Sequence, residues 1–533
     1  MAVSESPPRE GLTRRQMLQG AGGLATLAIA GAGVSELLHR TKPLPLPEIS
    51  SFAAGSAGSA HSFHSQPDLR PPTVTTTYAA STDAATTHPA VARRVPTDPE
   101  FLFLGPGPVS LATGSTQYGP LIIDRAGTPV WFRPLESGMQ VTNFTASEYR
   151  DEPVLVWWQG VIHESGYGQG EAVLVDRGYR EIARVQAAGG RWMDLHALTV
   201  TPQGTALFTC YPETVTMDLS AMNGPKNTQV LGSIIQEVDI ASGRLLFEWH
   251  GLQHIPVTAS EEPMAQPYDY LHINSIQQLS DGSLFVSARH TWALYKLERG
   301  TGNVIWTLGG KQSNFQMGPG AQFAWQHDAV QVSDQVLTVF DNGTNGPIKT
   351  EPQARGLELA VDESRRTVTL RHAYTTADQL LPGAMGSVQI LPSGNVMVGW
   401  GVDSLTSEFT ADGTLLYGAS LPEGMYSYRG LRLPWTAAPH HAPAVAAGRD
   451  GQSGATVLYA SWNGATDVAG WEVNAGAKHN HLRPLGIARR HGFETVIPLK
   501  HQPRFASVTP VDRAGKRLRH SPVIRVSDST TSR

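Results

Sequence analysis

Short apolar strands alternate with glycine-containing turns along most of the chain, from Phe101 to about Trp435. Each unit begins with an apolar strand, a turn and a second apolar strand. A strand ending in Asp, another turn and a strand with Trp or another large apolar residue follow. The clearest unit combines residues 275–286 with residues 293–297, a turn at Thr301-Gly302 and residues 304–308. Such runs of β-branched and aromatic residues between turns predict antiparallel strands.

Six such units lie about 35 to 60 residues apart. Four antiparallel strands at this period predict the blades of a β-propeller, because an array of separate β-sandwiches needs roughly 100 residues for each unit. We therefore expect an all-β chain with a six-bladed β-propeller over residues 62–437. Seven blades stay possible if the N-terminal region supplies more than one strand. Residues 73–78 have strand character and are expected to close the ring.

The last segment of the chain does not follow this repeat. Strands are expected at 457–462, 469–474 and 504–512, and their spacing, together with Trp462, is similar to that of a fibronectin type III module. Residues 438–533 are therefore expected to form a small C-terminal β-sandwich of immunoglobulin-like type with a tail. Modules of this kind are usually spacers or adhesion units.

The N-terminal segment Thr13-Arg14-Arg15-Gln16-Met17-Leu18 resembles the twin-arginine consensus. The weakly apolar stretch that follows, residues 20–34, is shorter than the roughly 20 residues that a permanent membrane helix needs. Residues 1–40 are therefore expected to direct export by the twin-arginine machinery, with residues 41–61 as a flexible tether. The protein would be secreted, on the cell surface or periplasmic, and anchored to the membrane if cleavage at 28–30 or 30–32 does not occur.

The amino-acid composition excludes several kinds of site and partner. The chain has one cysteine, Cys210, which excludes an intramolecular disulfide and any zinc or iron–sulfur site built on cysteines. The formal net charge is -5, but residues 439–533 carry a net positive charge and the middle of the chain is strongly acidic. An acidic middle repels nucleic acid, so no nucleic-acid partner is expected.

Three polar residues lie eight positions before the inner turn of successive units: His196, Asn274 and His327. Because the first strand of each blade lines the central channel, these residues are expected to meet at one rim. His272 precedes Asn274 by two residues and would lie on the same face of its strand. Arg289 ends the second strand of that unit and could reach the same cavity.

Other polar and aromatic residues nearby have less defined roles. Asn342 occupies the corresponding place in the next unit, where structuring of a loop is an equally good interpretation. Residues 157–160 and 426–429 are rich in Trp and Tyr and are expected mainly to pack the core and the rim. Trp and Tyr side chains that line a cavity would also suit a flat aromatic ligand.

These residues resemble the bacterial arylsulfotransferases that need no nucleotide sulfate donor. The resemblance covers about residues 67–435. Its most specific elements are Asp194-Leu-His196, Leu271-His272-Ile-Asn274-Ser, Ser287-Ala-Arg289 and Trp325-Gln-His327-Asp328-Ala. In that family a channel histidine attacks the sulfuryl group of an aryl sulfate, and a phenol then takes the group.

By order and context, His327 matches the nucleophile and His196 a further catalytic histidine. The resemblance places His272, Arg289 and the substrate-binding Asn274 around the sulfuryl group, where His272 is expected to be protonated and to donate to its oxygens. Asn342 is taken as a second substrate-binding residue. It implies ping-pong transfer from a phenolic sulfate ester to a phenol through a sulfohistidine, without a metal or other cofactor.

Two further interpretations stay open. Three imidazoles on one rim could instead hold a divalent ion for hydrolase or lyase chemistry. The protein could also be a non-enzymatic propeller that presents ligands to a cell surface through its C-terminal module. A dehydrogenase with a quinone cofactor is less favoured, because such propellers usually have more blades and repeated Trp motifs.

Overall fold

Apolar strands joined by tight turns make up most of the described chain, which is all-β. The computed structural model describes residues 46–53, 60–78, 100–109, 116–164, 166–450 and 453–526. The predicted signal segment, residues 1–40, lies outside them. Within the described ranges, no helix combines the length and the apolar character that crossing a bilayer requires.

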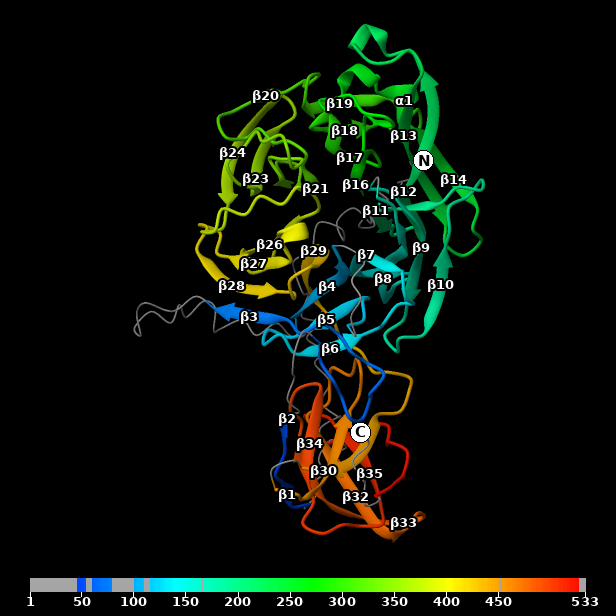
Figure 1. Ribbon diagram of the computed structural model, residues 1–533, viewed down its shortest axis with the longest axis vertical. Helices are drawn as coiled ribbons and strands as arrows, with labels where there is room; N and C mark the ends of the chain where they lie inside the picture. Colours follow the sequence, from blue (N-terminus) through cyan, green and yellow to red (C-terminus); the bar gives the residue numbers. More distant parts are fainter. Residues whose placement is uncertain are drawn as a thin grey trace, which may run out of the picture. The chain divides into compact units, whose positions relative to one another are not determined.

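Antiparallel strands follow one another in groups of four (Figure 1). Five groups are consecutive in sequence: β7 (Gln140–Tyr149), β8 (Glu152–Ile162), β9 (Gly168–Val175) and β10 (Glu181–Val185); β11 (Met193–Val200), β12 (Thr205–Met217), β13 (Thr228–Asp239) and β14 (Leu245–His250); β16 (Ile273–Gln278), β17 (Leu284–Ala288), β18 (Ala293–Leu297) and β19 (Val304–Gly309); β21 (His327–Ser333), β22 (Val336–Asp341), β23 (Arg355–Asp362) and β24 (Thr367–Tyr374); β25 (Ser387–Ile390), β26 (Val396–Gly399), β27 (Leu405–Phe409) and β28 (Leu415–Ser420). A pairing of β9 with β11 joins the first two groups into one larger sheet. Two short strands, β15 (Tyr268–Asp269) and β20 (Gln316–Met317), pair with β13 and β24.

The sixth group joins strands from distant parts of the chain. β29 (Met425–Pro434) pairs with β4 (Glu100–Pro108), and β5 (Leu121–Ile123) and β6 (Pro129–Phe132) follow in the same sheet. The first strands of successive groups contact one another in the order β7, β11, β16, β21, β25 and β29, and β29 contacts β7 in turn. The first strands therefore form a closed series of neighbours.

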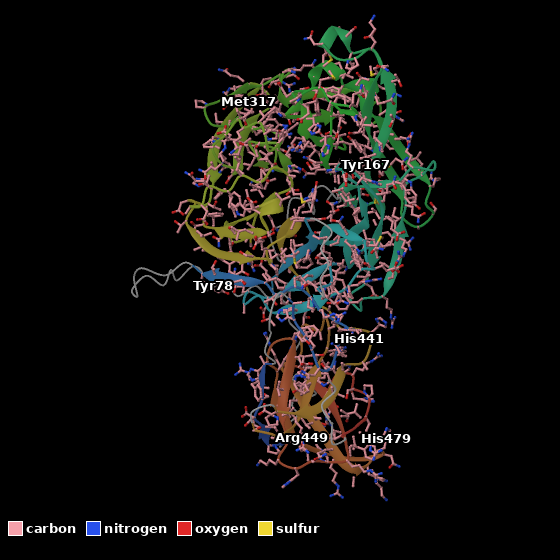
Figure 2. All side chains as sticks on the ribbon, viewed as in Figure 1. Tyr78, Tyr167, Met317, His441, Arg449 and His479 are labelled. Atoms are coloured by element: carbon pink, nitrogen blue, oxygen red, sulfur yellow. The ribbon has the colours of Figure 1, made fainter. Side chains whose placement is uncertain are left out.

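The prediction that residues 73–78 close this series was wrong. β3 (Thr75–Tyr78) pairs with β28 as the outermost strand of its sheet. Tyr78, labelled in Figure 2, is largely exposed and packs edge-on against Tyr417 with 5.4 Å between ring centroids. A short, exposed strand suits a sheet edge, whereas β4 is almost entirely buried and β29 mostly so, as strands inside the protein require.

The core lies between neighbouring sheets. Trp306 and Leu308 of β19, for example, belong to the same buried cluster as Leu337 of β22 and Leu359 of β23. Each sheet is thus covered on both faces, which explains why its strands read as short continuous apolar runs.

A shared hairpin turn supports the alignment of the units. Gly204, Gly282 and Gly394 follow the first strands of three groups and have φ values of 78°, 85° and 87°. In each turn the glycine N–H donates to the carbonyl oxygen three residues earlier. A side chain is disfavoured at such a φ, so glycine marks the same structural position in each group. Residues eight positions earlier are therefore equivalent.

The C-terminal strands form two separate sheets. One contains β30 (Ala444–Arg449), β31 (Thr456–Ser461), β34 (Glu494–Pro498) and β2 (Phe52–Ala53), and the other contains β32 (Gly470–Lys478), β33 (His481–Arg489), β35 (Phe505–Val511), β1 (Glu48–Ile49) and β36 (Ile524–Arg525). Residues of both sheets share one buried cluster, which includes Trp462 and Trp471. The expected tether over residues 41–61 differs from this structure, because β1 and β2 hydrogen-bond to the edges of these sheets.

Candidate active site

Polar side chains gather where first strands begin and second strands end. His196 lies in β11, His272 directly precedes β16 and His327 is the first residue of β21. Arg289 directly follows β17, and Asn342 directly follows β22. All five residues are buried. Because these strands are neighbours, the five side chains belong to one region of the structure although they are far apart in the sequence.

His196 and His272 meet through their Nε2 atoms, which lie 3.0 Å apart. Each ring turns its Nδ1 atom toward a carboxylate: His196 lies 2.6 Å from Oδ2 of Asp194, and His272 lies 2.5 Å from Oδ2 of Asp269. These four residues, Asp194, His196, His272 and Asp269, form a continuous hydrogen-bonded row that we call the relay.

The two ends of the relay differ electrostatically. Burial alone would raise the pKa of Asp194, but the adjacent His196 and backbone N–H groups outweigh burial and hold this pKa below its usual value. At the other end, burial raises the pKa of Asp269 despite the neighbouring His290. Burial lowers the pKa of His272 well below its usual range, and His196 and Arg289 lower it further. The relay therefore favours a neutral His272.

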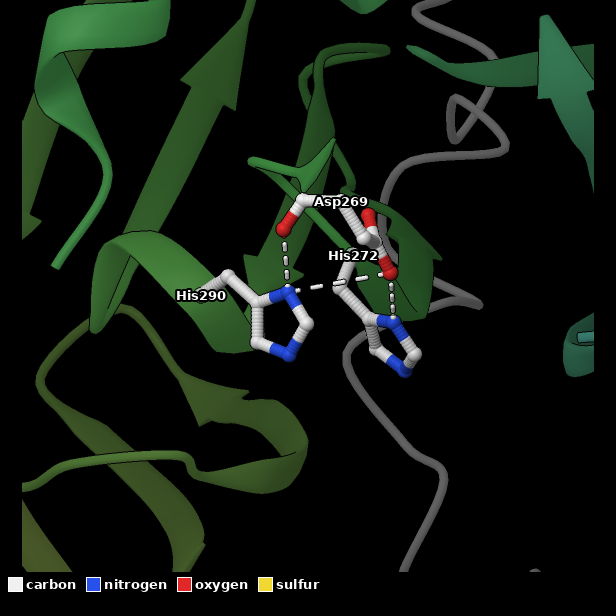
Figure 3. Close-up of side chains that lie close together, drawn as sticks. All are labelled: Asp269, His272 and His290. Carbon is white, nitrogen blue, oxygen red and sulfur yellow. Dashed lines mark hydrogen bonds and ion pairs between the residues drawn. The ribbon is translucent and has the colours of Figure 1, made fainter. Parts of the chain in front are cut away.

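His290 lies beside the Asp269 end of the relay (Figure 3). Its Nδ1 atom is 2.6 Å from the backbone oxygen of Asp269 and 3.6 Å from Oδ2 of the same residue. A carbonyl oxygen only accepts hydrogen bonds, so Nδ1 carries the hydrogen. His290 Nε2 then accepts a hydrogen bond from Nη1 of Arg289 at 2.7 Å. Both nitrogens of His290 are thus occupied.

Asn342 determines which nitrogen of His327 carries the hydrogen. Nδ2 of Asn342 donates to the carbonyl oxygens of Pro382 and Met385, at 2.9 and 3.0 Å. Its Oδ1 therefore faces Nδ1 of His327, at 2.7 Å, and Nδ1 must be the donor. The lone pair of His327 lies on Nε2, to which the backbone N–H of Met385 donates at 3.2 Å.

The environment of His327 also keeps it uncharged. The side chain is only 2% exposed. Burial lowers the pKa of His327 well below its usual range, and the positive charge of Arg289 lowers it further. At neutral pH the ring is therefore neutral, and its electron pair lies on Nε2.

Arg289 is a buried cation that has no ion-pair partner among the described residues. Its Nη2 atom donates to the backbone oxygen of Gly383 at 2.8 Å, and no carboxylate of the described residues lies within the 4.0 Å of an ion pair. Burial lowers the pKa of Arg289, although Glu262 and Asp269 oppose this change. By contrast, Arg429 lies 2.7 Å from Oδ1 of Asp328. An uncompensated buried guanidinium favours an anionic ligand.

Aromatic side chains border this cluster. The ring of Tyr428, from β29, lies 6.1 Å from that of His196 and 6.4 Å from that of His327. The Tyr428 hydroxyl is buried and has no hydrogen-bond partner among the described residues. On the other side, the Tyr211 ring lies 6.1 Å from that of His272. Tyr rings next to a cationic and imidazole-rich cluster suit a flat, aromatic anion.

Comparison with known proteins assigns the family. Residues 146–420 match the family model described as arylsulfotransferase (ASST), which covers just over half of the chain. The chain belongs to the arylsulfotransferase family. No curated protein sequence matches it.

Solved structures similar to this chain share little sequence with it. A protein of unknown function from Bacteroides caccae is 13% identical, with a TM-score of 0.39, over 63% of this chain and 99% of its own. A protein from Lactobacillus plantarum is 14% identical, with a TM-score of 0.34, over 80% and 97% of the two chains. Virginiamycin B lyase from Staphylococcus aureus is 10% identical, with a TM-score of 0.26, over 68% and 99%.

Two expectations about His272, its strand face and its protonation, do not agree with the structure. His272 precedes β16 and has a φ of 54°, so it is not on the same strand face as Asn274. Its left-handed backbone turns the ring toward His196 instead. The expectation that His272 is protonated also conflicts with the burial that lowers its pKa.

Asn274 lies in the same region but contacts the chain before His327. Its Nδ2 group donates to the backbone oxygen of Gln326 at 2.6 Å. Oδ1 of Asn274 is buried without a hydrogen-bond partner among the described residues. This contact holds the residue immediately before His327 and leaves the amide oxygen of Asn274 unpaired.

The sequence interpretation missed Asp269 and His290 and gave Asp194 no role. Asp194 lies two residues before His196, and Asp269 three residues before His272. Acidic residues at these short spacings were a usable signal, because a carboxylate commonly orients the imidazole next to it. His290 directly follows Arg289, which was singled out without it.

Proposed function

We propose that this protein moves a sulfuryl group from a phenolic sulfate ester to a phenol through a covalent intermediate on His327. The observation that carries the proposal is the state of this histidine. It is buried and neutral, and Asn342 holds its hydrogen on Nδ1, so that the electron pair lies on Nε2. A neutral imidazole of fixed tautomer is a suitable nucleophile.

In the first half of the reaction, Nε2 of His327 attacks the sulfur atom and the bond between sulfur and the aryl oxygen breaks. The electron pair of that bond leaves with the phenolate. The backbone N–H of Met385, which contacts Nε2, must give way for this attack. Oδ1 of Asn342 accepts from Nδ1 and stabilises the positive charge that the ring gains on sulfation.

The sulfuryl oxygens carry negative charge throughout, and Arg289 is the cation available to bind them. Its charge has no carboxylate partner within ion-pair distance among the described residues. A fixed donor of this kind stabilises charge that develops in the transition state. The buried hydroxyl of Tyr428 is a further donor for these oxygens, whereas Asn274 already donates to Gln326 and leaves only its amide oxygen, an acceptor, unpaired among the described residues.

In the second half, a phenol replaces the first product and its oxygen attacks the sulfur of sulfated His327. The bond between sulfur and Nε2 breaks, and its electron pair returns to the ring. The hydrogen-bonded pair of His196 and His272 takes up the proton that the acceptor phenol loses. Since donor and acceptor occupy the site in turn, the kinetics are ping-pong.

We further infer that the six groups of four strands are the blades of a six-bladed propeller and that the two C-terminal sheets form a β-sandwich. The closed series of contacts from β7 to β29 supports the first inference. The buried cluster shared by the two C-terminal sheets supports the second. A ring of blades places His196, His272 and His327 at one end of a central channel.

The direct test is to incubate the protein with an aryl sulfate in the absence of acceptor, digest it and analyse the peptides by mass spectrometry. We expect one sulfuryl group on the peptide that contains His327. Addition of a phenol should remove the modification and produce the new sulfate ester. A protein that turns over aryl sulfate without ever carrying a sulfated His327 would refute the proposal.

Transfer is expected to survive prolonged treatment with a chelator, because no step requires a metal ion. The alternative with three imidazole ligands needs His196, His272 and His327 around one ion. In the described part of the chain, the three ligand groups that lie within 4.8 Å of one another are Asp269, His272 and His290. Loss of activity with chelator and recovery with a divalent ion, measured with the same aryl sulfate, would favour the metal-dependent alternative.

A further inference from the structure

We propose that Asp269 stores the proton that is exchanged during each half of the reaction, and that His272 passes this proton between Asp269 and the reacting phenolic oxygen. The inference rests on the proposed sulfuryl transfer. It assigns a task to a carboxyl group that lies at the far end of the relay, 2.5 Å from Nδ1 of His272.

The positions of the protons follow from the three hydrogen bonds of the relay. Asp194, whose pKa is lowered, is a carboxylate and accepts from Nδ1 of His196. With the hydrogen of that bond on Nδ1, Nε2 of His196 is the acceptor of the bond between the rings, and Nε2 of His272 is its donor. Nδ1 of His272 is left as an acceptor, and only a protonated Asp269 can donate to it.

The alternative arrangement moves each proton to the other side of its bond. It contains the same number of protons and the same net charge, but it places the carboxyl group at Asp194 and the carboxylate at Asp269. The carboxylate is better placed at Asp194, which accepts from the backbone N–H groups of Gly168 and His196 and from the hydroxyl of Thr209. Oδ1 of Asp269, by contrast, is buried without a hydrogen-bond partner among the described residues. The lowered pKa of Asp194 and the raised pKa of Asp269 agree with the first arrangement.

This arrangement can protonate the leaving phenolate without forming a histidinium. The hydrogen on Nε2 of His272 moves to the phenolate oxygen, and the hydrogen of the Asp269 carboxyl group moves to Nδ1 of His272. The products are a neutral phenol, a neutral His272 and the Asp269 carboxylate. When the acceptor phenol enters, its hydrogen moves to Nε2 and the hydrogen on Nδ1 returns to Asp269.

A metal ion does not fit the same three residues. Nδ1 of His290 carries its hydrogen toward the backbone oxygen of Asp269 (Figure 3). Its Nε2 accepts from Arg289. His290 therefore has no electron pair to give to a metal. The two Nε2 atoms of His196 and His272 converge, but two nitrogens fall short of the three protein ligands of a typical catalytic zinc site.

The variant Asp269→Asn tests proton storage, because an amide can still donate to Nδ1 of His272 but cannot release its hydrogen. Phenol release is measured in a single turnover without acceptor, using two donors. With phenyl sulfate, whose leaving group has a pKa near 10, we expect the rate to fall about 10²-fold or more. With a nitrophenyl sulfate, whose phenolate leaves without proton transfer, we expect a change of only a few-fold.

Glu213→Gln is the matched control. Glu213 lies 3.1 Å from Nδ1 of His250, in a carboxylate–histidine pair outside the relay, and its replacement should leave both rates unchanged. Equal losses with both donors in Asp269→Asn, or no loss with either, would overturn proton storage. Full activity of a His327→Ala variant would instead overturn the proposed function, so the two failures are distinguishable.

Discussion

The variant His327→Ala is expected to lose sulfuryl transfer by about 10⁴-fold or more, because it removes the atom that forms the covalent bond to sulfur. The remaining groups can still bind the donor. Arg289 keeps its hydrogen bonds to Gly383 and His290, neither of which involves His327. We therefore expect the loss in kcat, measured with an aryl sulfate and a phenol, with binding of the donor retained.

Loss of the buried imidazole also leaves polar groups without partners, so the free energy of unfolding of His327→Ala is measured beside its activity. Oδ1 of Asn342 and the N–H of Met385 both contact this ring. The variant His327→Gln retains a polar side chain there and should be equally inactive. His372→Ala, on the outer strand β24, serves as the histidine control and should keep wild-type activity. A folded His327→Ala protein with full turnover would contradict the covalent mechanism.

The convergence of His196 and His327 could be predicted because it depends on a local signal. Glycine at positive φ marks the same hairpin turn after β11, β16 and β25. In the group of His327, Gln335 stands at the aligned position, and counting eight residues back from it still reaches the start of the first strand. Since neighbouring first strands contact one another, equivalence in the repeat becomes proximity in space. Burial of His327 follows from the same position at the start of β21.

The residues that support these histidines depend on structure outside the repeat. Asp269 belongs to β15, which pairs in parallel with β13 and lies outside the four strands of any group. His290 lies in a short 3-10 turn, Arg289–Thr291. Closure by β29 instead of β3 is a contact between distant segments, and both are plausible strands by composition. Local patterns do not specify which strand pairs with which edge.

Arg289→Gln is expected to lower transfer by about 10²- to 10³-fold, the effect typical of removing one preorganised donor from a transition state. The same variant should be as stable as the wild type or more stable. The reason is that Arg289 is a buried cation with no carboxylate partner within ion-pair distance among the described residues, and burial lowers its pKa. Folding of the wild-type protein takes the charged guanidinium out of water, which lowers the free energy of unfolding. A neutral side chain removes that cost.

Arg355→Gln provides the contrast, because Arg355 is partly buried, with a side chain 13% exposed, and lies 2.5 Å from the carboxylate of the fully buried Asp341. Its removal leaves that carboxylate without its partner and should lower the free energy of unfolding by about 3–5 kcal/mol. Low concentrations of inorganic sulfate should raise the Tm of the wild type more than chloride at equal ionic strength, and this excess should vanish in Arg289→Gln. If Arg289→Gln were destabilised as strongly as Arg355→Gln, with sulfate acting equally on both, Arg289 would be a structural cation and the sulfuryl group would need another binding partner.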